Sequence, residues 1–233
     1  MGSGDDKMLG GYLREDEKLL LSLEETVDPK HTALVVVDMQ NDYVHGRGQT
    51  VPVPGEPLNA YQKVAPNLVA FVEACRKVGV PIFWVITRHG PDIDFPAYKA
   101  RIARRGEGPV AMEGTKGAEL IRELVPRKGE RMFVKHGYDG FTGNDLDICL
   151  KNRGIATLIM SGVVTNTCVD ATLKHGFHLG YYIVAGSDIM AAVEQQVQDI
   201  YLRSFAEHYG LVVSSREIAK IWGVALELRE SSP

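Results

Sequence analysis

The sequence predicts an α/β fold with three layers, in which helices cover both faces of a Rossmann-like, six-stranded and mostly parallel sheet. Three observations support this class. Six short runs rich in β-branched residues alternate with segments of helical periodicity, the first run is continuously apolar over residues 32–37, and no internal repeat or low-complexity linker divides the chain. Alternating strands and helices favour a parallel sheet, because each helix carries the chain back across one face of the sheet.

The expected strands are short apolar runs bounded by polar residues or glycines. The first run closes with the carboxylate of Asp38, and its unbroken apolar character is typical of a strand that is buried on both faces. The third run closes with Lys135. In chain order the six expected strands occupy residues 32–38, 80–87, 131–135, 155–162, 181–188 and 211–215.

The expected helices have apolar residues three and four positions apart. Residues 68, 69, 72 and 75 form such a stripe ahead of a terminal glycine. Thr165 and Asn166 begin another helical pattern and belong to residue types that cap helices well. The expected helices cover residues 65–79, 117–126, 144–154, 165 to 176 or 180, 193–210 and 216–223.

Two long connections, residues 45–59 and 89–116, are expected to form ordered loops. Loops of this length inside a domain usually act as lids over a site or as contacts between subunits. The second loop contains the densest run of positive charge in the chain, YKARIARRGEG at residues 98–108. A solvated helix face is the favoured interpretation of this run, and a site for an anionic substrate is the alternative.

Length and composition indicate one globular domain over residues 30–233, preceded by a partly disordered N-terminal extension over residues 1–29. The net charge of −4 and the pI near 6.0 give no electrostatic reason to bind nucleic acid. No apolar run approaches the roughly 18–20 residues that would span a membrane, and the first residues are too polar for a signal peptide. Three widely spaced cysteines predict no disulfide framework and a reducing compartment, so we expect a cytoplasmic protein.

Three reactive side chains follow or end strands of the expected sheet. Asp38 ends the first strand, Lys135 ends the third, and Cys168 lies just past the fourth. Ligands of parallel sheets bind outside the carboxyl ends of the strands, where these three side chains would meet. Each alone has a structural explanation: Asp38 could cap a helix or turn, Lys135 could be a solvated strand end, and Cys168 could be a small core residue. Together they favour a nucleophilic thiol, with a base and a positive charge that promote thiolate formation, further helped by a helix N-terminus. Cys75 and Cys149 fall on amphipathic helical patterns and are expected to be structural.

The segments around these residues carry a family resemblance. ALVVVDMQNDY, FVKHGYDGF and GVVTNTCVDAT, in this order, resemble the three signatures of the isochorismatase-like cysteine hydrolases. This superfamily includes nicotinamidases and the N-carbamoylsarcosine and ureidoacrylate amidohydrolases, and the resemblance spans roughly residues 30 to 222. It implies the isochorismatase-like hydrolase fold, a catalytic triad of Asp38, Lys135 and Cys168, and a cis peptide bond between Val163 and Val164. The backbone amides of Val164 and Cys168 would then form the oxyanion hole.

The resemblance also implies the reaction. The thiol of Cys168 would attack an amide carbonyl and form a thioester, Asp38 would move the proton, and ammonia or an amine would leave. No metal or cofactor is expected. The expected substrate is a small ureido, carbamoyl or primary amide compound. Vinyl ether hydrolysis, nicotinamide hydrolysis, and a non-catalytic binding or scaffold role are the alternatives. Since the family commonly forms dimers or tetramers, we expect a homo-oligomer.

Candidate pocket residues follow from the same segments. We expect Asn41, Tyr43, Tyr138 and Phe141 to line the pocket, with Arg88 or Arg104 as an anchor for an anionic substrate. Val164, Tyr43 and the pair Asp170–Ala171 depart from the Ala, Phe and Glu-Ser that family members often have. Nicotinamidases usually carry a metal-binding motif after the second strand. Here that segment contains only His89 and Asp92, so we expect a pocket or lid histidine and no metal.

Overall fold

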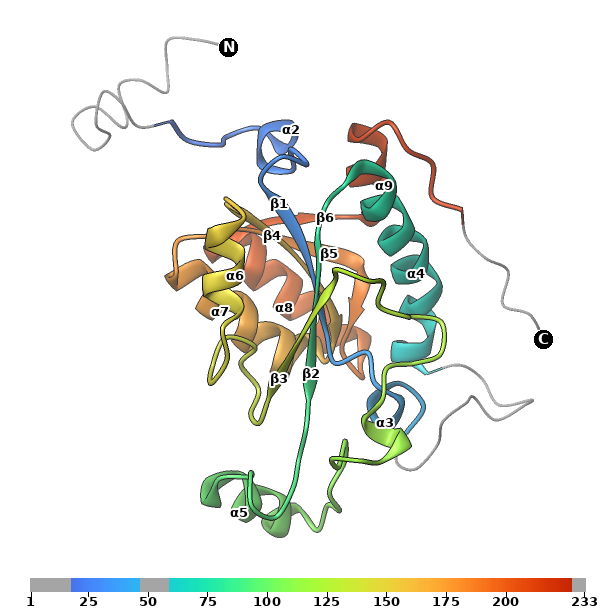
Figure 1. Cartoon of the computed structure of the whole chain (residues 1–233), viewed down its shortest axis with the longest axis vertical. Coiled ribbons are helices and arrows are strands. Elements are labelled where there is room, and N and C mark those ends of the chain that lie inside the picture. Colours follow the sequence, from blue (N-terminus) through green and yellow to red (C-terminus); the bar gives the residue numbers. More distant parts are fainter. Residues whose placement is uncertain (1–17, 47–58, 228–233) are drawn as a thin grey trace.

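A six-stranded sheet with the order β3-β2-β1-β4-β5-β6 forms the centre of the computed structural model, which describes residues 18–46 and 59–227 (Figure 1). All five pairs of neighbouring strands are parallel. The predicted fold class is therefore confirmed. The strands are β1 (Thr32–Val37), β2 (Ile82–Thr87), β3 (Arg131–Lys135), β4 (Thr157–Val163), β5 (Tyr182–Ala191) and β6 (Gly210–Val213).

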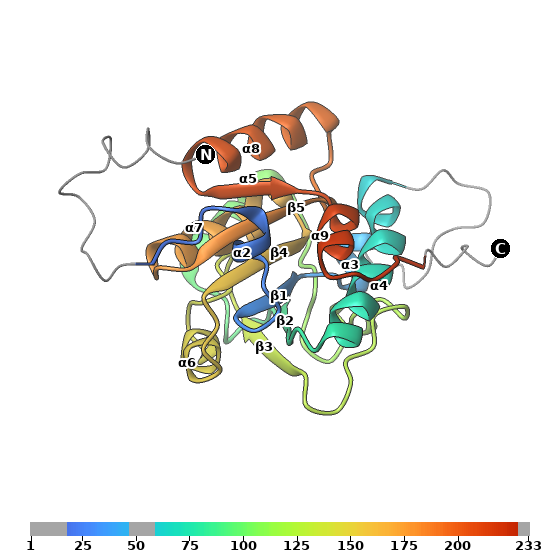
Figure 2. The same cartoon turned by 90° about the horizontal axis from the view of Figure 1, so that it is seen from above.

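Helices cover both faces of the sheet, as Figures 1 and 2 show. Helices α4 (Ala60–Val78) and α9 (Ser215–Ile221) pack on the face that carries Trp84. Helices α6 (Leu146–Asn152), α7 (Asp170–His178) and α8 (Gln195–His208) pack on the face that carries Phe83. Strands β1, β2 and β4 are buried along their whole length, which explains their unbroken apolar sequence.

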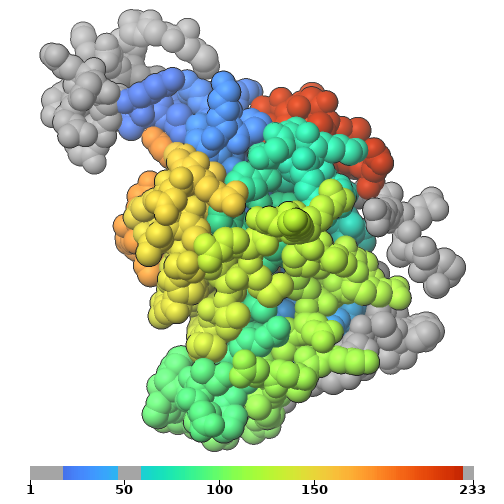
Figure 3. All heavy atoms as spheres, in the orientation of Figure 1, coloured from blue at the N-terminus to red at the C-terminus, as the bar shows by residue number. Residues whose placement is uncertain are grey.

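The carboxyl ends of the strands meet the smaller elements α3 (Asn41–Val44), α5 (Pro96–Arg105) and the 3-10 turn η1 (Lys116–Ala118). Helix α5 projects from this end and gives the molecule its narrow lower part in Figures 1 and 3. The segment expected to be a loop, residues 89–116, thus contains the helix α5. This helix ends at Arg105 and is capped by Gly106, whose backbone has the left-handed conformation. Most of the other long loop, residues 45–59, lies outside the described residues.

The helix predicted over residues 117–126 is not formed. This segment runs beside the chain that leaves β1, and backbone groups at its centre pair with that chain instead of forming a continuous helix. The amide of Asn41 donates to the carbonyl of Glu119 at 2.9 Å, and the amide of Ile121 donates to the carbonyl of Met39 at 2.9 Å. Ile121 and Leu124 are buried in the core below, which accounts for the helix-like spacing of apolar residues in the sequence.

The segment before β1, assigned from sequence to the N-terminal extension, contributes to the described core. It forms the single-turn helix α2 (Leu23–Thr26), and Val27 is fully buried. The indole of Trp222 donates a 2.7 Å hydrogen bond to the carbonyl of Val27, which fastens α2 beside the end of α9. The part of the extension before residue 18 lies outside the described residues.

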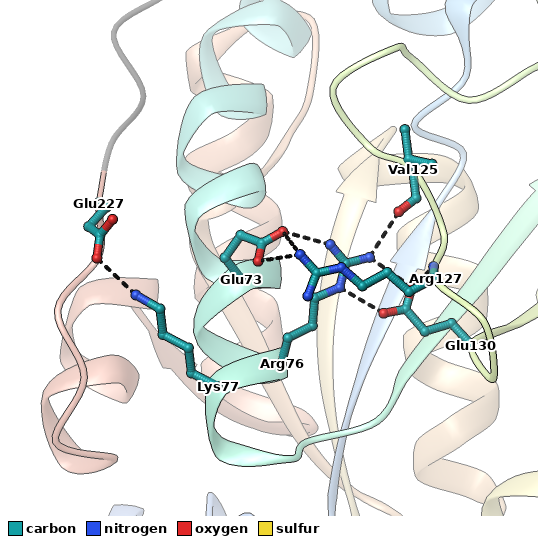
Figure 4. A network of polar contacts seen from close by, with 7 residues as sticks. All are labelled: Glu73, Arg76, Lys77, Val125, Arg127, Glu130 and Glu227. Carbon is teal, nitrogen blue, oxygen red and sulfur yellow. Dashed lines mark hydrogen bonds and ion pairs between the residues drawn. The ribbon is translucent and has the colours of Figure 1, made fainter.

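A polar network attaches α4 to the residues that lead into β3 (Figure 4). The carboxylate of Glu130 accepts hydrogen bonds from Arg76 Nε at 2.7 Å and from Trp84 Nε1 at 2.9 Å. Arg76 Nη2 and the backbone amide of Arg127 also donate to this carboxylate, each at 2.9 Å. Because Glu130 immediately precedes β3, this network sets the position of the edge strand that ends at Lys135.

Every helix in the described parts of the chain is too short or too polar to cross a membrane.

Candidate active site

A cavity of about 690 Å³ opens at the carboxyl ends of the strands and contains Cys168 in its lining. Sheet order reverses at this place, because β1 has β2 on one side and β4 on the other. Crevices at such reversals are the usual ligand sites of open parallel sheets. The lining comes from the ends of β2 and β4, from α3, α4 and α5, from the turn after β3, and from the start of α8.

Asp38 follows β1 in an unusual backbone conformation. Its φ of 51° lies in the left-handed region, which aspartate tolerates better than most side chains do. Its amide donates to the Val85 carbonyl at 2.9 Å, so strand pairing with β2 continues through this residue. The side chain is 1% exposed. The turn therefore directs a carboxylate into the protein at the edge of the sheet.

Lys135 is the partner of this carboxylate. Its ammonium donates to Asp38 Oδ2 at 2.8 Å, to Thr87 Oγ1 at 2.6 Å and to the carbonyl of Gly137 at 2.9 Å. Thr87 in turn donates to Asp38 Oδ1 at 2.9 Å. Burial acts to lower the pKa of Lys135, but the charge of Asp38 and its hydrogen bond with Lys135 act in the opposite direction, and the net shift is upward. Each of the three N–H groups of the buried Lys135 ammonium therefore has a hydrogen-bond acceptor.

Cys168 lies in a single turn of π-helix, Thr165–Val169, between β4 and α7. Its side chain interacts with both Asp38 and Lys135. Burial and the neighbouring charge of Asp38 raise the pKa of the Cys168 thiol to about 12, although Lys135 acts in the opposite direction. The sequence-based expectation that the surroundings favour a thiolate is therefore wrong, because burial and the Asp38 carboxylate favour the neutral thiol.

The turn that presents Cys168 contains the predicted cis peptide bond between Val163 and Val164. The expectation that Thr165 and Asn166 cap the following helix is wrong, since no side chain caps this turn and the chain enters it from Val164. Gly162, just before the cis bond, has a φ of 101°. A Cβ at this position would lie 1.9 Å from the carbonyl oxygen of Val37, so only glycine allows β4 to approach β1 this closely.

The predicted pocket residues divide into two groups. Tyr43 and Tyr138 line the cavity with Cys168. Burial and the charge of Asp38 raise the pKa of Tyr43, which keeps its hydroxyl protonated. The other predicted residues are not in the described lining of this cavity.

Three of those other residues have partners elsewhere in the structure, and the fourth, Arg104, is exposed. Asn41 donates to the carbonyl of Lys116 at 2.9 Å and helps to hold the segment that replaces the predicted helix. Arg88 donates to the carbonyl of Ala118. The ring of Phe141 stacks against Tyr181 in the core on the α7 side of the sheet. Arg104, on α5, is exposed.

His89 lines the cavity, as expected of a pocket histidine. Its Nδ1 lies 2.7 Å from Asp94 Oδ1, and its ring stacks on Tyr98 with the centroids 4.3 Å apart. The carboxylate that it meets is therefore Asp94 and not Asp92. Within the described residues, no group of three or more His, Cys, Asp or Glu side chains is arranged to hold a metal ion.

Sequence reasoning missed two kinds of site residue. Thr87, which bridges Asp38 and Lys135, ends the second strand at the same edge, and this position in the sequence is the signal that could have revealed it. Gln40 holds Thr87 in place, because its side chain accepts from the Thr87 amide at 2.8 Å and donates to the Thr87 carbonyl at 2.9 Å. The second kind are the cavity-lining residues of α5, Tyr98, Arg101 and Arg105, which belong to the basic run whose favoured interpretation from sequence was a solvated helix face.

Comparison with known proteins gives consistent matches. Residues 32–217 match the family model described as an isochorismatase domain. The chain is 35% identical over 176 residues to the ureidoacrylate amidohydrolase RutB of Enterobacter sp. (strain 638), covering 70% of this chain and 76% of that protein. The crystal structure of N-carbamoylsarcosine amidase from Thermoplasma acidophilum matches with a TM-score of 0.66 and 31% identity, over 79% of this chain and 96% of that one. An isochorismatase family protein from Desulfovibrio vulgaris matches with a TM-score of 0.70 and 26% identity, over 83% and 99% of the two chains. The family-model match includes all six strands together with Asp38, Lys135 and Cys168.

Proposed function

This chain belongs to the isochorismatase family of hydrolases, as its three sequence motifs predicted, and we propose that it cleaves the C–N bond of a small ureido, carbamoyl or primary amide substrate. The observation that carries the proposal is that the buried Cys168 thiol interacts electrostatically with the buried Asp38–Lys135 pair at the edge of a substrate-sized cavity. The names of two relatives, a ureidoacrylate amidohydrolase and an N-carbamoylsarcosine amidase, support this reaction type.

In the proposed mechanism Asp38 is the general base. Since the pKa of the Cys168 thiol is raised, attack on the carbonyl carbon requires transfer of the thiol proton to Asp38 as the C–S bond forms. Lys135 stays charged throughout and limits the electrostatic cost of moving negative charge from Asp38 to the substrate. The carbonyl oxygen, now an oxyanion, accepts hydrogen bonds from the backbone amides of Val164 and Cys168.

The second half of the reaction uses the same groups in reverse. Asp38 gives its proton to the leaving nitrogen when the C–N bond breaks, which releases ammonia or an amine and leaves a thioester on Cys168. A water molecule then loses a proton to Asp38 and attacks the thioester, and the thiol is regenerated when the C–S bond breaks. Loss of one oxyanion donor typically lowers the rate by about 100- to 1000-fold, so the backbone of the Val164 turn is an essential part of this proposal.

A non-catalytic binding role explains the site less well. A buried ion pair is weak in net stabilisation and demanding in geometry, so a binding module gains little from Asp38 and Lys135 at this position. A hydrolase needs both of them beside the thiol.

The test is ammonia release from a panel of small ureido, carbamoyl and primary amide compounds. We expect turnover with at least one of these classes, loss of turnover in Cys168→Ala, and an added mass on Cys168 when the reaction is quenched early. Full turnover by Cys168→Ala would exclude the covalent mechanism. Cleavage of vinyl ethers but not of amides would replace the proposed reaction with the isochorismatase type.

A further inference from the structure

Thr87 connects the buried Asp38–Lys135 pair with the cavity. In the proposed mechanism Asp38 passes a proton to the leaving nitrogen and later takes one from water, and both of these groups lie in the cavity. Asp38 is only 1% exposed, however, and neither Asp38 nor Lys135 is in the described lining of the cavity. Thr87 is part of that lining and is hydrogen-bonded to both residues. The buried pair therefore reaches the cavity through Thr87 and Cys168.

The hydrogen bonds of the Thr87 hydroxyl suit it to carry a proton. A hydroxyl has one proton and two lone pairs. Thr87 Oγ1 donates its proton to Asp38 Oδ1 at 2.9 Å, and one of its lone pairs accepts from Lys135 at 2.6 Å. The other lone pair is left for a donor in the cavity, either water or the Tyr43 hydroxyl, which also interacts with Thr87. Hydrogen bonds in a chain polarise one another, so the charge of Lys135 makes the Thr87 proton easier to release.

Gln40 fixes the position of this hydroxyl. The fully buried side chain of Gln40 accepts from the Thr87 amide at 2.8 Å and donates to the Thr87 carbonyl at 2.9 Å. It also donates to the carbonyl of Ala118 at 2.7 Å, which holds the amide group itself in place. Thr87 and Lys135 are register partners in β2 and β3. Thr87 is therefore held at the hydrogen-bond distances that proton transfer requires.

We propose that the Thr87 hydroxyl is a proton relay between Asp38 and the reacting groups in the cavity. The inference rests on the proposed function and adds one catalytic residue to it. After the thiol has attacked, Asp38 holds the thiol proton on Oδ1, the oxygen that Thr87 contacts. Asp38 donates this proton to Thr87 Oγ1, while Thr87 gives its own proton to the leaving nitrogen as the C–N bond breaks.

Both transfers reverse when the thioester is hydrolysed. The attacking water gives a proton to Thr87 Oγ1, and Thr87 gives its own proton to Asp38 Oδ1. When the C–S bond breaks, the departing thiolate takes that proton from Asp38. Asp38, Thr87 and Lys135 therefore end each cycle in the protonation states in which they began.

p-Nitrophenyl acetate tests the relay without the natural substrate. Its leaving group departs as an anion, so acetylation of Cys168 takes no proton from the relay, whereas hydrolysis of the thioester by water uses it. Thr87→Val keeps the shape of the side chain and removes the hydroxyl. We expect this variant to be acetylated within about tenfold of the wild-type rate and to be deacetylated at least about 100-fold more slowly, since a positioned acid–base group typically contributes about 100- to 10,000-fold. Mass spectrometry of the acetylated peptide measures both rates.

Three variants and one reagent separate proton transfer from a structural role. Thr87→Ser keeps a hydroxyl and should restore most of the deacetylation rate. Hydroxylamine, which attacks a thioester without first losing a proton, should cleave acetylated Thr87→Val and acetylated wild type at similar rates. Thr157→Val should leave both rates unchanged, because it removes a buried hydroxyl that has no hydrogen-bond partner among the described residues, at the opposite end of β4. Tyr43→Phe should slow deacetylation less than Thr87→Val does, and an equal or larger effect would overturn the assignment to Thr87.

The wild type provides a measurement that does not depend on the folding of a variant. If two protons move together, the deacetylation rate should fall along a curve as the fraction of D2O in the solvent rises. A straight line, which indicates one moving proton, would overturn the relay.

Ammonia release separates this inference from the proposed reaction. Deacetylation that depends on Thr87, in a protein that releases no ammonia from the amide panel, would support the relay and contradict the proposed hydrolysis. Ammonia release by Thr87→Val at the wild-type rate would support the hydrolysis and overturn the relay. A wild type that is neither acetylated at Cys168 nor able to release ammonia would overturn both.

Discussion

The ammonium of Lys135 donates a 2.8 Å hydrogen bond to the carboxylate of Asp38 where solvent reaches at most 1% of either side chain. Opposite charges removed from water are stable together only when their remaining hydrogen-bonding positions are also filled. Thr87 binds both members of the pair, and the Gly137 carbonyl accepts from Lys135. The hydrogen-bonding positions of the pair are therefore filled within the site, and loss of either residue leaves the charge of the other buried and unpaired.

The first prediction concerns this dependence. Lys135→Met should lower the free energy of unfolding by about 3–5 kcal/mol, because it leaves the Asp38 charge buried and unpaired. The double variant Lys135→Met/Asp38→Asn removes both charges and should recover a large part of that loss, whereas activity is lost in both. Urea denaturation at pH 7 provides the measurement. A double variant no more stable than Lys135→Met would show that the two charges do not depend on each other.

The second prediction concerns the protonation of Cys168. Since burial and the charge of Asp38 raise the pKa of this thiol to about 12, its thiolate fraction should increase about tenfold per pH unit across the range from 7 to 10. The rate of alkylation of Cys168 by iodoacetamide should follow that increase without a plateau, as measured by mass spectrometry of the modified peptide. Cys75 is fully buried and should react more slowly still. A plateau near pH 7 would indicate a resting thiolate.

The sequence was sufficient to predict the sheet and to place Asp38, Lys135 and Cys168 at one edge of it, and the reason is physical. Strand β1 is buried on both faces and has a continuous apolar pattern, so the polar residue that follows it, Asp38, lies at the carboxyl edge of the sheet. Lys135 is the last residue of β3, the edge strand of the sheet, and reaches the same end. The cis peptide bond before Val164 came from the family resemblance and is confirmed. Periodicity alone could not have indicated it.

The failures have equally specific causes. Ile121 and Leu124 have the spacing of a helix face, but their backbone pairs with the chain after β1, an interaction between distant segments that no local pattern encodes. The pKa of Cys168 was expected in the wrong direction because burial depends on the complete packing of the site. Asn41 and Phe141 were assigned to the pocket by their proximity to motif residues, yet Phe141 packs into the core behind the site.

The third prediction concerns the contact between β1 and β4. Gly162→Ala should prevent the native turn, because its Cβ would lie 1.9 Å from the Val37 carbonyl oxygen and its φ of 101° is strained for alanine. Gly180→Ala is the matched control, since φ is 93° but no atom lies within 4 Å of the added Cβ. We expect a loss of about 1–2 kcal/mol at Gly180 and a clearly larger loss, with loss of activity, at Gly162. Chemical denaturation and ammonia release measure the two effects, and equal losses would contradict the prediction.

The fourth prediction concerns the network around Glu130. Burial acts to raise the pKa of Glu130, but its hydrogen bonds with Arg76, the Arg127 amide and Trp84 outweigh it, so the net shift is downward from 4.5. A lowered pKa in the folded state means that the carboxylate stabilises the protein above about pH 4.5 and loses this contribution as the pH falls. Glu130→Gln should lower the free energy of unfolding by about 1.5–3 kcal/mol at pH 7 and by less at pH 4.

The control for that network is Lys77, which lies on α4 next to Arg76. Lys77 pairs with Glu227, but the two side chains are 50% and 80% exposed, so Lys77→Met should change the free energy of unfolding by less than about 1 kcal/mol. Neither substitution should alter kcat by a large factor if the network only supports the position of β3. An effect of Glu130→Gln that grows as the pH falls would contradict the assigned charge state.

The last prediction concerns the attachment of α5. Tyr98 is the buried residue of this helix, and its ring stacks on His89, which Asp94 holds at 2.7 Å. Tyr98→Ala removes that stacking and should loosen the helix, so trypsin should cleave after the α5 arginines several-fold faster than in the wild type. Phe95→Ala is the control, because Phe95 is 48% exposed and contributes less packing. Unchanged proteolysis would show that contacts other than the Tyr98–His89 stack hold the helix in place.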